Sequence, residues 1–359
     1  MGFFKDVDIT NSQGAAPDRT NLLVKVTEQP TGQLSFSAGY SSIDKLVTDI
    51  GISQSNFRGR AEDLRARLSL GSLRQNADLS FTEPHFLGRD MQGGWDLYAQ
   101  RYDFSTQASY TSTELGATAR LAFPLSQNAL LSAHYSIRSD NVIVNDALCV
   151  PGAELVSFVL CEQRGSYLTS LIGYSLGLNR TNDPLNPSRG YYLNFSQEIA
   201  GLGGSVHYLK TEARGAFYHG FNKDVIFSLT GSSGYVDGWN GNGVRITDRF
   251  YKGGDDFRGF QIAGIGPRDT QFGDSLGGKL YAVGSAELTL PTKLPEQYGI
   301  HASLFTDFGT LGILDRANKI NPNTNQPLIA VRDDLGFRAS AGISIFWKSP
   351  LGPLRFDFS

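Results

Sequence analysis

From Gly32 onward the chain consists of segments of about ten residues in which apolar and polar side chains alternate. Between residues 335 and 347 one set of alternate positions is entirely apolar, and the other set, from Gly336 to Ser344, carries only Gly, Ser and Arg338. Successive side chains of a β-strand point to opposite faces, so each segment predicts a strand with one apolar face. A soluble sandwich would alternate in the same way, but the number and length of the segments favour a transmembrane antiparallel β-barrel. The predicted fold class is therefore all-β.

Fifteen segments are predicted to be strands, and the connections between them fall into two classes. The predicted strands are residues 32–41, 46–56, 63–72, 76–83, 92–103, 110–122, 128–138, 166–179, 190–199, 206–219, 224–235, 279–290, 299–309, 334–347 and 353–359. The longest connections are 139–165, 236–278 and 310–333, whereas those on the other side are mostly short turns. Long outer loops and short periplasmic turns are typical of outer-membrane barrels. The chain before the first strand is therefore expected in the periplasm.

The odd strand count predicts that one strand is missing. Bacterial barrels of this kind have an even number of strands and both chain ends in the periplasm, whereas fifteen strands would leave Ser359 at the outer surface. We expect residues 31–359 to be a barrel of the 16-stranded type that lacks its final strand. Residues 1–30 contain only two strand-like stretches, too few to bury a core. They are expected to be the remnant of a small domain.

Several classes of function are disfavoured by composition. The net charge is −3 and there is no run of Lys or Arg, so nucleic acid is not an expected partner. The five histidines are scattered over different predicted strands and turns, without the spacing that a barrel hydrolase or acyltransferase requires. We therefore predict that the protein is not an enzyme and has no metal site and no cofactor. No window of eighteen apolar residues predicts a membrane-spanning helix.

The only two cysteines, Cys149 and Cys161, lie within one predicted loop. A disulfide between them requires an oxidising compartment, and a metal site would need more ligands nearby. A disulfide is the prediction, and two free thiols are the alternative.

One arginine stands out in the predicted loop 236–278, where residues 253–260 read GGDDFRGF. Two later predicted strands each place one carboxylate, Glu287 and Asp307, on a face otherwise made of small and polar residues. A guanidinium matches a carboxylate geometrically, and such a pair is stronger inside a protein than in bulk water. We therefore predict that the loop folds into the barrel and that Arg258 binds both acids on the inner wall.

Five motifs, in order along the chain, resemble those of the BamA family of outer-membrane barrels. GGDDFRGF resembles the family's VRGF/Y loop signature, with Phe257 in place of valine and with Gly259 and Phe260 completing it. FTDFG at 305–309 resembles an FxDxG strand motif. RASAG and SPLGPLRF resemble segments before the last strand, and residues 19–42 resemble the junction of the final POTRA domain with the barrel. The resemblance covers essentially the whole chain.

This resemblance implies a factor that inserts and folds other outer-membrane proteins. It implies that residues 1–30 are a periplasmic POTRA remnant and that the barrel sits in the bacterial outer membrane. The expected partners are unfolded outer-membrane protein clients, the lipid bilayer, and accessory assembly lipoproteins through the absent POTRA array. Clients would pair with the free edge of the first strand at a lateral seam. The residues expected there are Gly32, Leu34, Phe36, Ala38 and Tyr40.

Three alternatives remain open. The translocation-assembly protein TamA and two-partner-secretion transporters resemble the same family, although the latter carry a plugging N-terminal helix for which this chain has no evident room. A passive porin fits a polar lumen, but porins lack the constellation of Arg258, Glu287 and Asp307 and the POTRA-like lead-in. A large, steady conductance would favour a porin over an assembly barrel.

Overall fold

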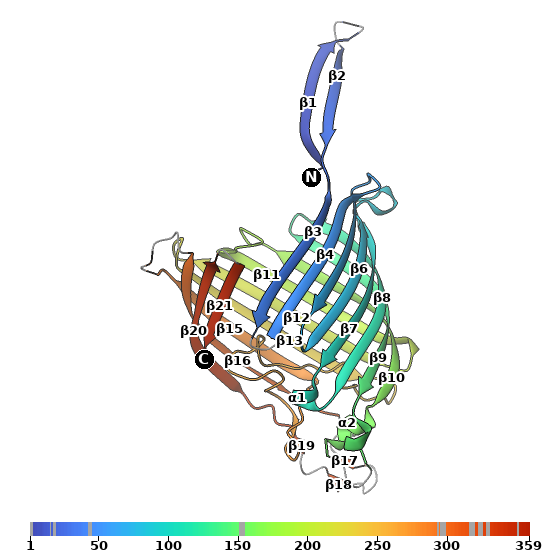
Figure 1. Ribbon diagram of the computed structural model, residues 1–359, viewed down its shortest axis with the longest axis vertical. Coiled ribbons are helices and arrows are strands. Elements are labelled where there is room, and N and C mark those ends of the chain that lie inside the picture. Colours follow the sequence, from blue (N-terminus) through green and yellow to red (C-terminus); the bar gives the residue numbers. More distant parts are fainter. Residues whose placement is uncertain are drawn as a thin grey trace.

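The computed structural model describes residues 3–14, 16, 19–41, 45–150, 155–292, 294, 299–315, 320–321, 326–327, 331–349 and 352–359. A single antiparallel sheet of fifteen strands dominates it, with β3 and β21 at its two edges. The sheet curls round into a barrel, and a two-stranded hairpin projects from one end (Figure 1). The predicted all-β antiparallel barrel is confirmed.

Each predicted strand corresponds to one strand of the barrel. These are β3 (Gly32–Ser41), β4 (Lys45–Phe57), β5 (Glu62–Leu70), β6 (Arg74–Glu83), β7 (Gln92–Asp103), β8 (Thr111–Ser126), β9 (Ala129–Ile143), β10 (Gly165–Asn179), β11 (Arg189–Gly204), β12 (Tyr208–Gly220), β13 (Ile226–Gly238), β15 (Leu280–Leu290), β16 (Ile300–Gly312), β20 (Arg338–Ser349) and β21 (Gly352–Phe358). The hairpin is β1 (Phe4–Gln13) and β2 (Thr20–Glu28). The connections contain α1 (Ser105–Ala108), α2 (Phe158–Glu162), η1 (Phe86–Gly88), η2 (Asp146–Leu148), β14 (Arg268–Asp269), β17 (Ile320–Asn321), β18 (Gln326–Pro327) and β19 (Val331–Arg332).

Several strand ends differ from the sequence prediction. β9 continues to Ile143 rather than ending at 138, because its polar outer end still pairs with β8, as Asn141 does with Thr113. β20 begins at Arg338 rather than at 334, because its pairing with β16 starts only at Arg338, opposite Gly309. In the loop before it, the Asp333 side chain accepts backbone hydrogen bonds from Ile313 (2.8 Å) and Leu314 (3.0 Å). Apolar alternation fades where strands leave the membrane, so pattern alone places these ends poorly.

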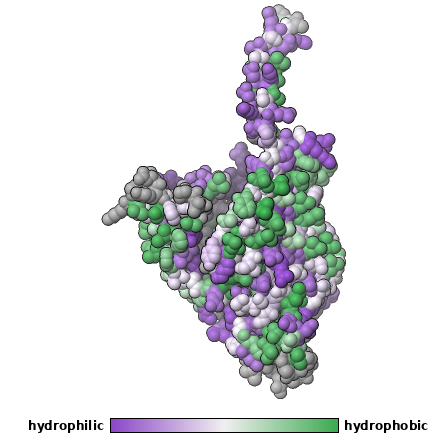
Figure 2. All heavy atoms as spheres, viewed as in Figure 1, coloured by the Kyte–Doolittle hydropathy of each residue, from purple (hydrophilic) through white to green (hydrophobic). Residues whose placement is uncertain are grey.

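The wall has a polar inner face and an apolar outer face. Ser285, Asp307 and Ser340 form one inward-facing row across β15, β16 and β20. The outer face exposes large apolar side chains on most strands: Ile52, Leu68, Leu79, Leu97, Leu115, Ile137, Ile172, Leu193, Phe217, Leu229, Leu304, Ile343 and Phe356. Apolar side chains gather on the barrel wall, whereas the hairpin is mostly polar (Figure 2). An apolar outer band is what contact with lipid requires.

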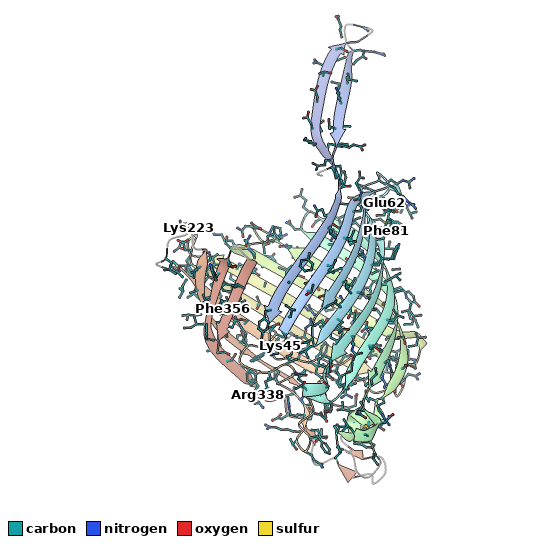
Figure 3. All side chains as sticks on the ribbon, in the orientation of Figure 1. Lys45, Glu62, Phe81, Lys223, Arg338 and Phe356 are labelled. Atoms are coloured by element: carbon teal, nitrogen blue, oxygen red, sulfur yellow. A yellow bond between two sulfur atoms is a disulfide. The ribbon has the colours of Figure 1, made fainter. Side chains whose placement is uncertain are left out.

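Charged side chains mark the ends of the wall. Glu62 and Lys223 lie toward the hairpin end, and Lys45 and Arg338 toward the loop end (Figure 3). This distribution leaves the apolar band between two polar rims, as in a membrane-embedded barrel. Among the described residues, none of the helices is long and apolar enough to cross a membrane.

The hairpin β1–β2 is a separate sheet, with Val7 paired to Val26 and Ile9 to Val24. All of its residues are exposed, including the apolar Leu22 and Leu23. Two strands cannot bury a core alone. That residues 1–30 are part of a POTRA domain stays a prediction.

β21 runs from the hairpin end of the wall toward the loop end, which is the direction that the odd strand count predicts for the chain leading to Ser359 (Figure 1). β21 pairs only with the part of β20 from Ile343 to Ser349, so it stops partway along the wall. A Cβ placed on Gly259, in the loop inside the barrel, would lie 3.1 Å from the Ser359 hydroxyl. The Ser359 side chain therefore faces the lumen, as does that of Asp357 two residues earlier.

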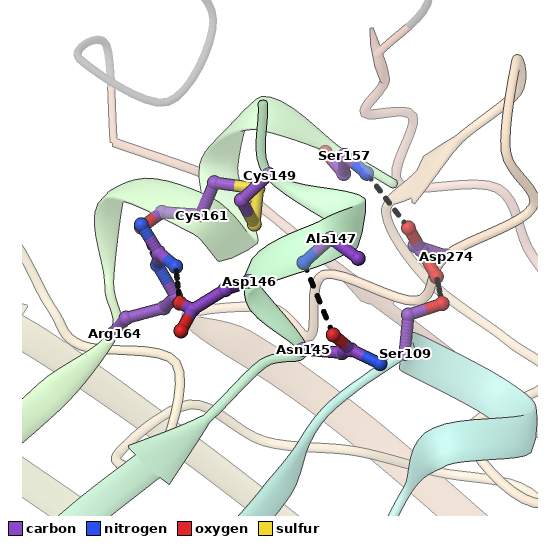
Figure 4. Close-up of a disulfide and its surroundings, with 9 residues drawn as sticks. All are labelled: Ser109, Asn145, Asp146, Ala147, Cys149, Ser157, Cys161, Arg164 and Asp274. Carbon is purple, nitrogen blue, oxygen red and sulfur yellow. Dashed lines mark hydrogen bonds and ion pairs between the residues drawn. A yellow bond between two sulfur atoms is a disulfide. The ribbon is translucent and has the colours of Figure 1, made fainter. Parts of the chain in front are cut away.

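The outer loops form a core of their own. It combines residues from the connection around α1, the end of β9 with the connection through α2, the loop after β13 and the loop after β16: Ala108, Tyr110, Val142, Val144, Cys149, Val156, Val159, Leu160, Ile246, Leu276 and Leu314. Asp274 ties these segments together, because it accepts hydrogen bonds from the Ser109 hydroxyl (2.6 Å) and the Ser157 amide (2.8 Å) (Figure 4). The barrel is thus capped at the end opposite the hairpin.

Candidate functional site

The connection between β13 and β15, residues 239–279, folds into the barrel. Its Phe250, Phe257 and Ile265 are buried in one cluster with wall residues, including Tyr208 and Tyr281. Phe250 lies edge-on to Tyr281, with ring centroids 4.6 Å apart. The loop fills the lumen with apolar side chains because its alternative, exposing them to water, costs free energy.

The GGDDFRGF segment makes a tight turn that presents Arg258. The Gly254 amide donates to the Phe260 carbonyl (2.8 Å), which closes the turn. Gly253 has φ +134°, and a Cβ there would lie 2.0 Å from the Gln261 carbonyl oxygen. Only glycine fits such a position. Phe257 is fully buried and packs edge-on against Phe260, with centroids 5.1 Å apart.

Arg258 binds Asp307 through three hydrogen bonds. Its Nη2 lies 2.6 Å from Oδ1, its Nε 2.8 Å from Oδ2, and its backbone amide donates to the same Oδ2 at 2.9 Å. Asp307 is only 4% exposed. A planar guanidinium that meets both oxygens of a carboxylate fixes orientation as well as distance.

The remaining donors of Arg258 reach β15 and an aromatic ring. Nη1 donates to Glu287 Oε2 at 3.1 Å and Nη2 to the Ser285 hydroxyl at 2.7 Å. The guanidinium carbon lies 3.5 Å from the centroid of the Phe305 ring, a cation–π contact. Burial disfavours the charged form, but the hydrogen bonds to Asp307 outweigh it, so the pKa of Arg258 lies above its usual value. The structure therefore brings together the three residues selected from the sequence.

Sequence reasoning missed the contributions of β20 and β21. The Ser340 hydroxyl donates to the Arg258 carbonyl at 2.6 Å. Asp357 lies 3.7 Å from Arg258, and Arg355 lies 3.5 Å from Glu287. These residues occupy alternate, inward-facing positions in their strands, so strand periodicity could have found them once the inward face was known.

The strand expected at the seam is an edge of the sheet. β3 pairs with β4 along its whole length, from Gly32 opposite Gln54 to Ser41 opposite Lys45, and the described residues show no second partner. Leu34, Phe36 and Tyr40 are 77%, 71% and 76% exposed on its outer face. Ala38 occupies the alternate position between Phe36 and Tyr40 on that face. The edge therefore offers unpaired backbone groups flanked by apolar side chains.

The two cysteines are joined, with Cys149 and Cys161 forming a disulfide and their Cα atoms 5.6 Å apart (Figure 4). The bond links η2 to α2 within the outer cap, not near Arg258. Around Arg258 the lumen keeps a cavity of about 570 Å³, lined by charged side chains of the loop and wall. Within the described ranges, no group of His, Cys, Asp and Glu has the arrangement of a metal site.

Comparisons with known proteins show which family and which proteins the chain resembles. A sequence model of the Omp85 superfamily domain matches residues 56–359. Proteins named outer membrane protein assembly factor BamA are similar: one from Neorickettsia risticii (strain Illinois) is 29% identical over 99% of this chain and 46% of its own length. One from Neisseria meningitidis serogroup B is 26% identical over 100% and 48%, respectively. This chain thus spans about half the length of these curated relatives.

A solved structure shares the fold. The crystal structure of BamA from Haemophilus ducreyi lacking POTRA domains 1–3 superposes with a TM-score of 0.85, covering 99% of this chain and 72% of that one. The two sequences are 24% identical, so this likeness concerns the barrel and the hairpin before it rather than individual side chains.

Proposed function

Because the chain belongs to the Omp85 superfamily, we propose that it is the barrel part of an outer-membrane protein assembly factor. In this proposal the barrel inserts client strands into the bacterial outer membrane without a chemical step of its own. The observation that carries the proposal is the free edge of β3 in a barrel whose outer face is apolar.

The edge of β3 explains how a client strand would be captured. In hydrocarbon an unpaired backbone group costs several kcal/mol, so an open strand edge is a strong template for a new strand. An unfolded client's terminal strand would add to β3 by β-augmentation, with the bilayer as the medium for both. The accessory lipoproteins expected from the resemblance would act through a POTRA array whose last domain ends with residues 1–30.

In the same proposal Arg258 has a structural role. It holds the inward loop against β15 and β16, so the loop stays in the lumen while a client strand pairs with β3. A lumen occupied by Phe250 and Phe257 also speaks against a passive porin.

Site-specific crosslinking tests this function. Leu34→Cys, Phe36→Cys and Tyr40→Cys would be paired with a client that carries one cysteine in its terminal strand. The native cysteines are already joined, so they do not compete. Ile172→Cys is the matched control, because Ile172 is also exposed and apolar but its strand, β10, is paired on both sides.

We expect crosslinks at β3 during assembly and none at Ile172. If the client assembles with no crosslink at any β3 position, or with equal yield at Ile172, the seam mechanism is wrong.

A further inference from the structure

A second cluster of charges holds the inward loop at a place remote from Arg258. Asp248, in the first part of the loop, is 1% exposed. Its carboxylate accepts a hydrogen bond from Nη2 of Arg138 on β9. The Nε of Arg138 also donates to Asp140 (3.0 Å), which in turn accepts from the Thr169 hydroxyl (3.2 Å). An ion pair this deeply buried persists only when its charges are mutually compensated.

The loop residues before Asp248 are fixed to the same side of the barrel. The Ile246 amide donates to the side chain of Gln163 (2.8 Å), and Arg245 donates to the Gln163 carbonyl (3.1 Å). Ile246 itself is fully buried in the outer core. This part of the loop is therefore positioned by backbone, apolar and charged contacts at once.

The two clusters have opposite polarity. At Arg258 the loop supplies the cation and the wall the acids, whereas at Asp248 the loop supplies the acid and the wall the cation. They also lie on different strands, because β11, β12 and β13 separate β10 from β15. If the loop docked in the opposite order, Arg258 would face Arg138 and Asp248 would face the acids of β15 and β16. Bringing like charges together in this way costs free energy.

We propose that Asp248 and Arg138 form a second anchor, which positions the base of the loop independently of Arg258. Between the anchors, Phe250 exchanges two backbone hydrogen bonds with Gly278, each 2.9 Å long, and Lys210 lies 4.9 Å from the centroid of its ring. Loss of the Arg258 contacts then frees residues 253–260 and leaves residues 244–252 in place. This second anchor is a structural proposal about the loop and does not depend on the proposed function in client assembly.

Hydrogen exchange measured by mass spectrometry on the folded barrel separates the two anchors. The variants are Arg258→Ala, Asp248→Asn, Arg138→Met and the double variant Arg138→Met/Asp248→Asn. Asp256→Asn is the matched control, because Asp256 is a largely exposed acid of the same loop and its ion pair is with Lys252, also of the loop (3.1 Å). Heat-dependent migration on gels reports separately whether each barrel has folded.

Arg138→Met should speed exchange in residues 244–252 at least about tenfold, because it leaves buried carboxylates unpaired. The double variant should exchange more slowly than Arg138→Met, because it removes one of those charges. Arg258→Ala should speed hydrogen exchange in residues 253–260 and leave the exchange rate of residues 244–252 near that of the wild type. If Arg138→Met does not fold, the second anchor is tested by comparing hydrogen exchange of residues 244–252 in Asp248→Asn with that in Asp256→Asn. Exchange should be faster in Asp248→Asn.

The second anchor is refuted if Arg258→Ala frees both segments equally. It is equally refuted if Asp248→Asn exchanges like Asp256→Asn, or if the double variant is no slower than Arg138→Met. None of these three results bears on client capture at β3, which the crosslinking experiment tests.

Discussion

At the scale of single residues, Arg258 does more than pair with one acid. Its guanidinium serves Asp307, Glu287 and Ser285 together, and its backbone is bound at both the amide and the carbonyl. Glu287 is in turn shared with Arg355 of β21. The three residues predicted from the sequence are therefore the centre of a larger network that spans four consecutive strands.

Arg258→Ala should detach residues 253–260 from the wall. Removing one partner of a buried charge pair costs about 3 kcal/mol, which corresponds to roughly hundredfold faster hydrogen exchange in this segment. Arg258→Lys should recover only part of the protection, because an ammonium cannot bind both oxygens of Asp307 and reach Glu287 as well.

The control for this prediction is Arg214→Ala, because Arg214 is a more exposed lumen arginine that pairs with Glu212 of its own strand. Full protection in Arg258→Lys, or no change in Arg258→Ala, would show that charge geometry does not hold the loop.

At the scale of elements, the two-residue period of apolar side chains predicted most of the strands and the faces on which their side chains lie. It placed Glu287 and Asp307 on the inner face, and the fifteen strands appear where alternation was continuous. Arg258 stood out because it lies in the glycine-flanked motif GGDDFRGF, whereas Asp248 has no such motif around it, so its pairing with Arg138 was not predicted. Asp140 was assigned to a loop because polar residues end the apolar alternation there, although β9 continues through it.

The disulfide between Cys149 and Cys161 is expected to stabilise the outer cap. Cys149→Ser/Cys161→Ser should loosen the outer cap, because closing a loop of this length contributes about 3 kcal/mol by restricting the unfolded chain. Hydrogen exchange should rise in residues 155–164 and stay unchanged in the wall strands. Faster exchange across β8 and β9 as well would mean that the bond stabilises the barrel rather than the cap alone.

At the scale of the whole molecule, three features act together. The outer face is apolar, the lumen is filled by an anchored loop, and β3 and β21 remain edges of one sheet. Because the loop is held by the wall strands and not by β3, the proposed pairing of a client strand with β3 would not require the loop to leave the lumen.

Client folding into preformed liposomes tests this account most directly. A denatured β-barrel client would be diluted into liposomes with or without the protein, in its full-length form, and its folded fraction followed by heat-dependent migration on gels. We predict that the client folds at least about tenfold faster with the protein present. A client strand paired with the edge of β3 leaves fewer backbone groups unpaired in hydrocarbon, and each unpaired group costs several kcal/mol during insertion. Equal folding rates in both liposome preparations, with the protein itself folded and inserted, would contradict the account.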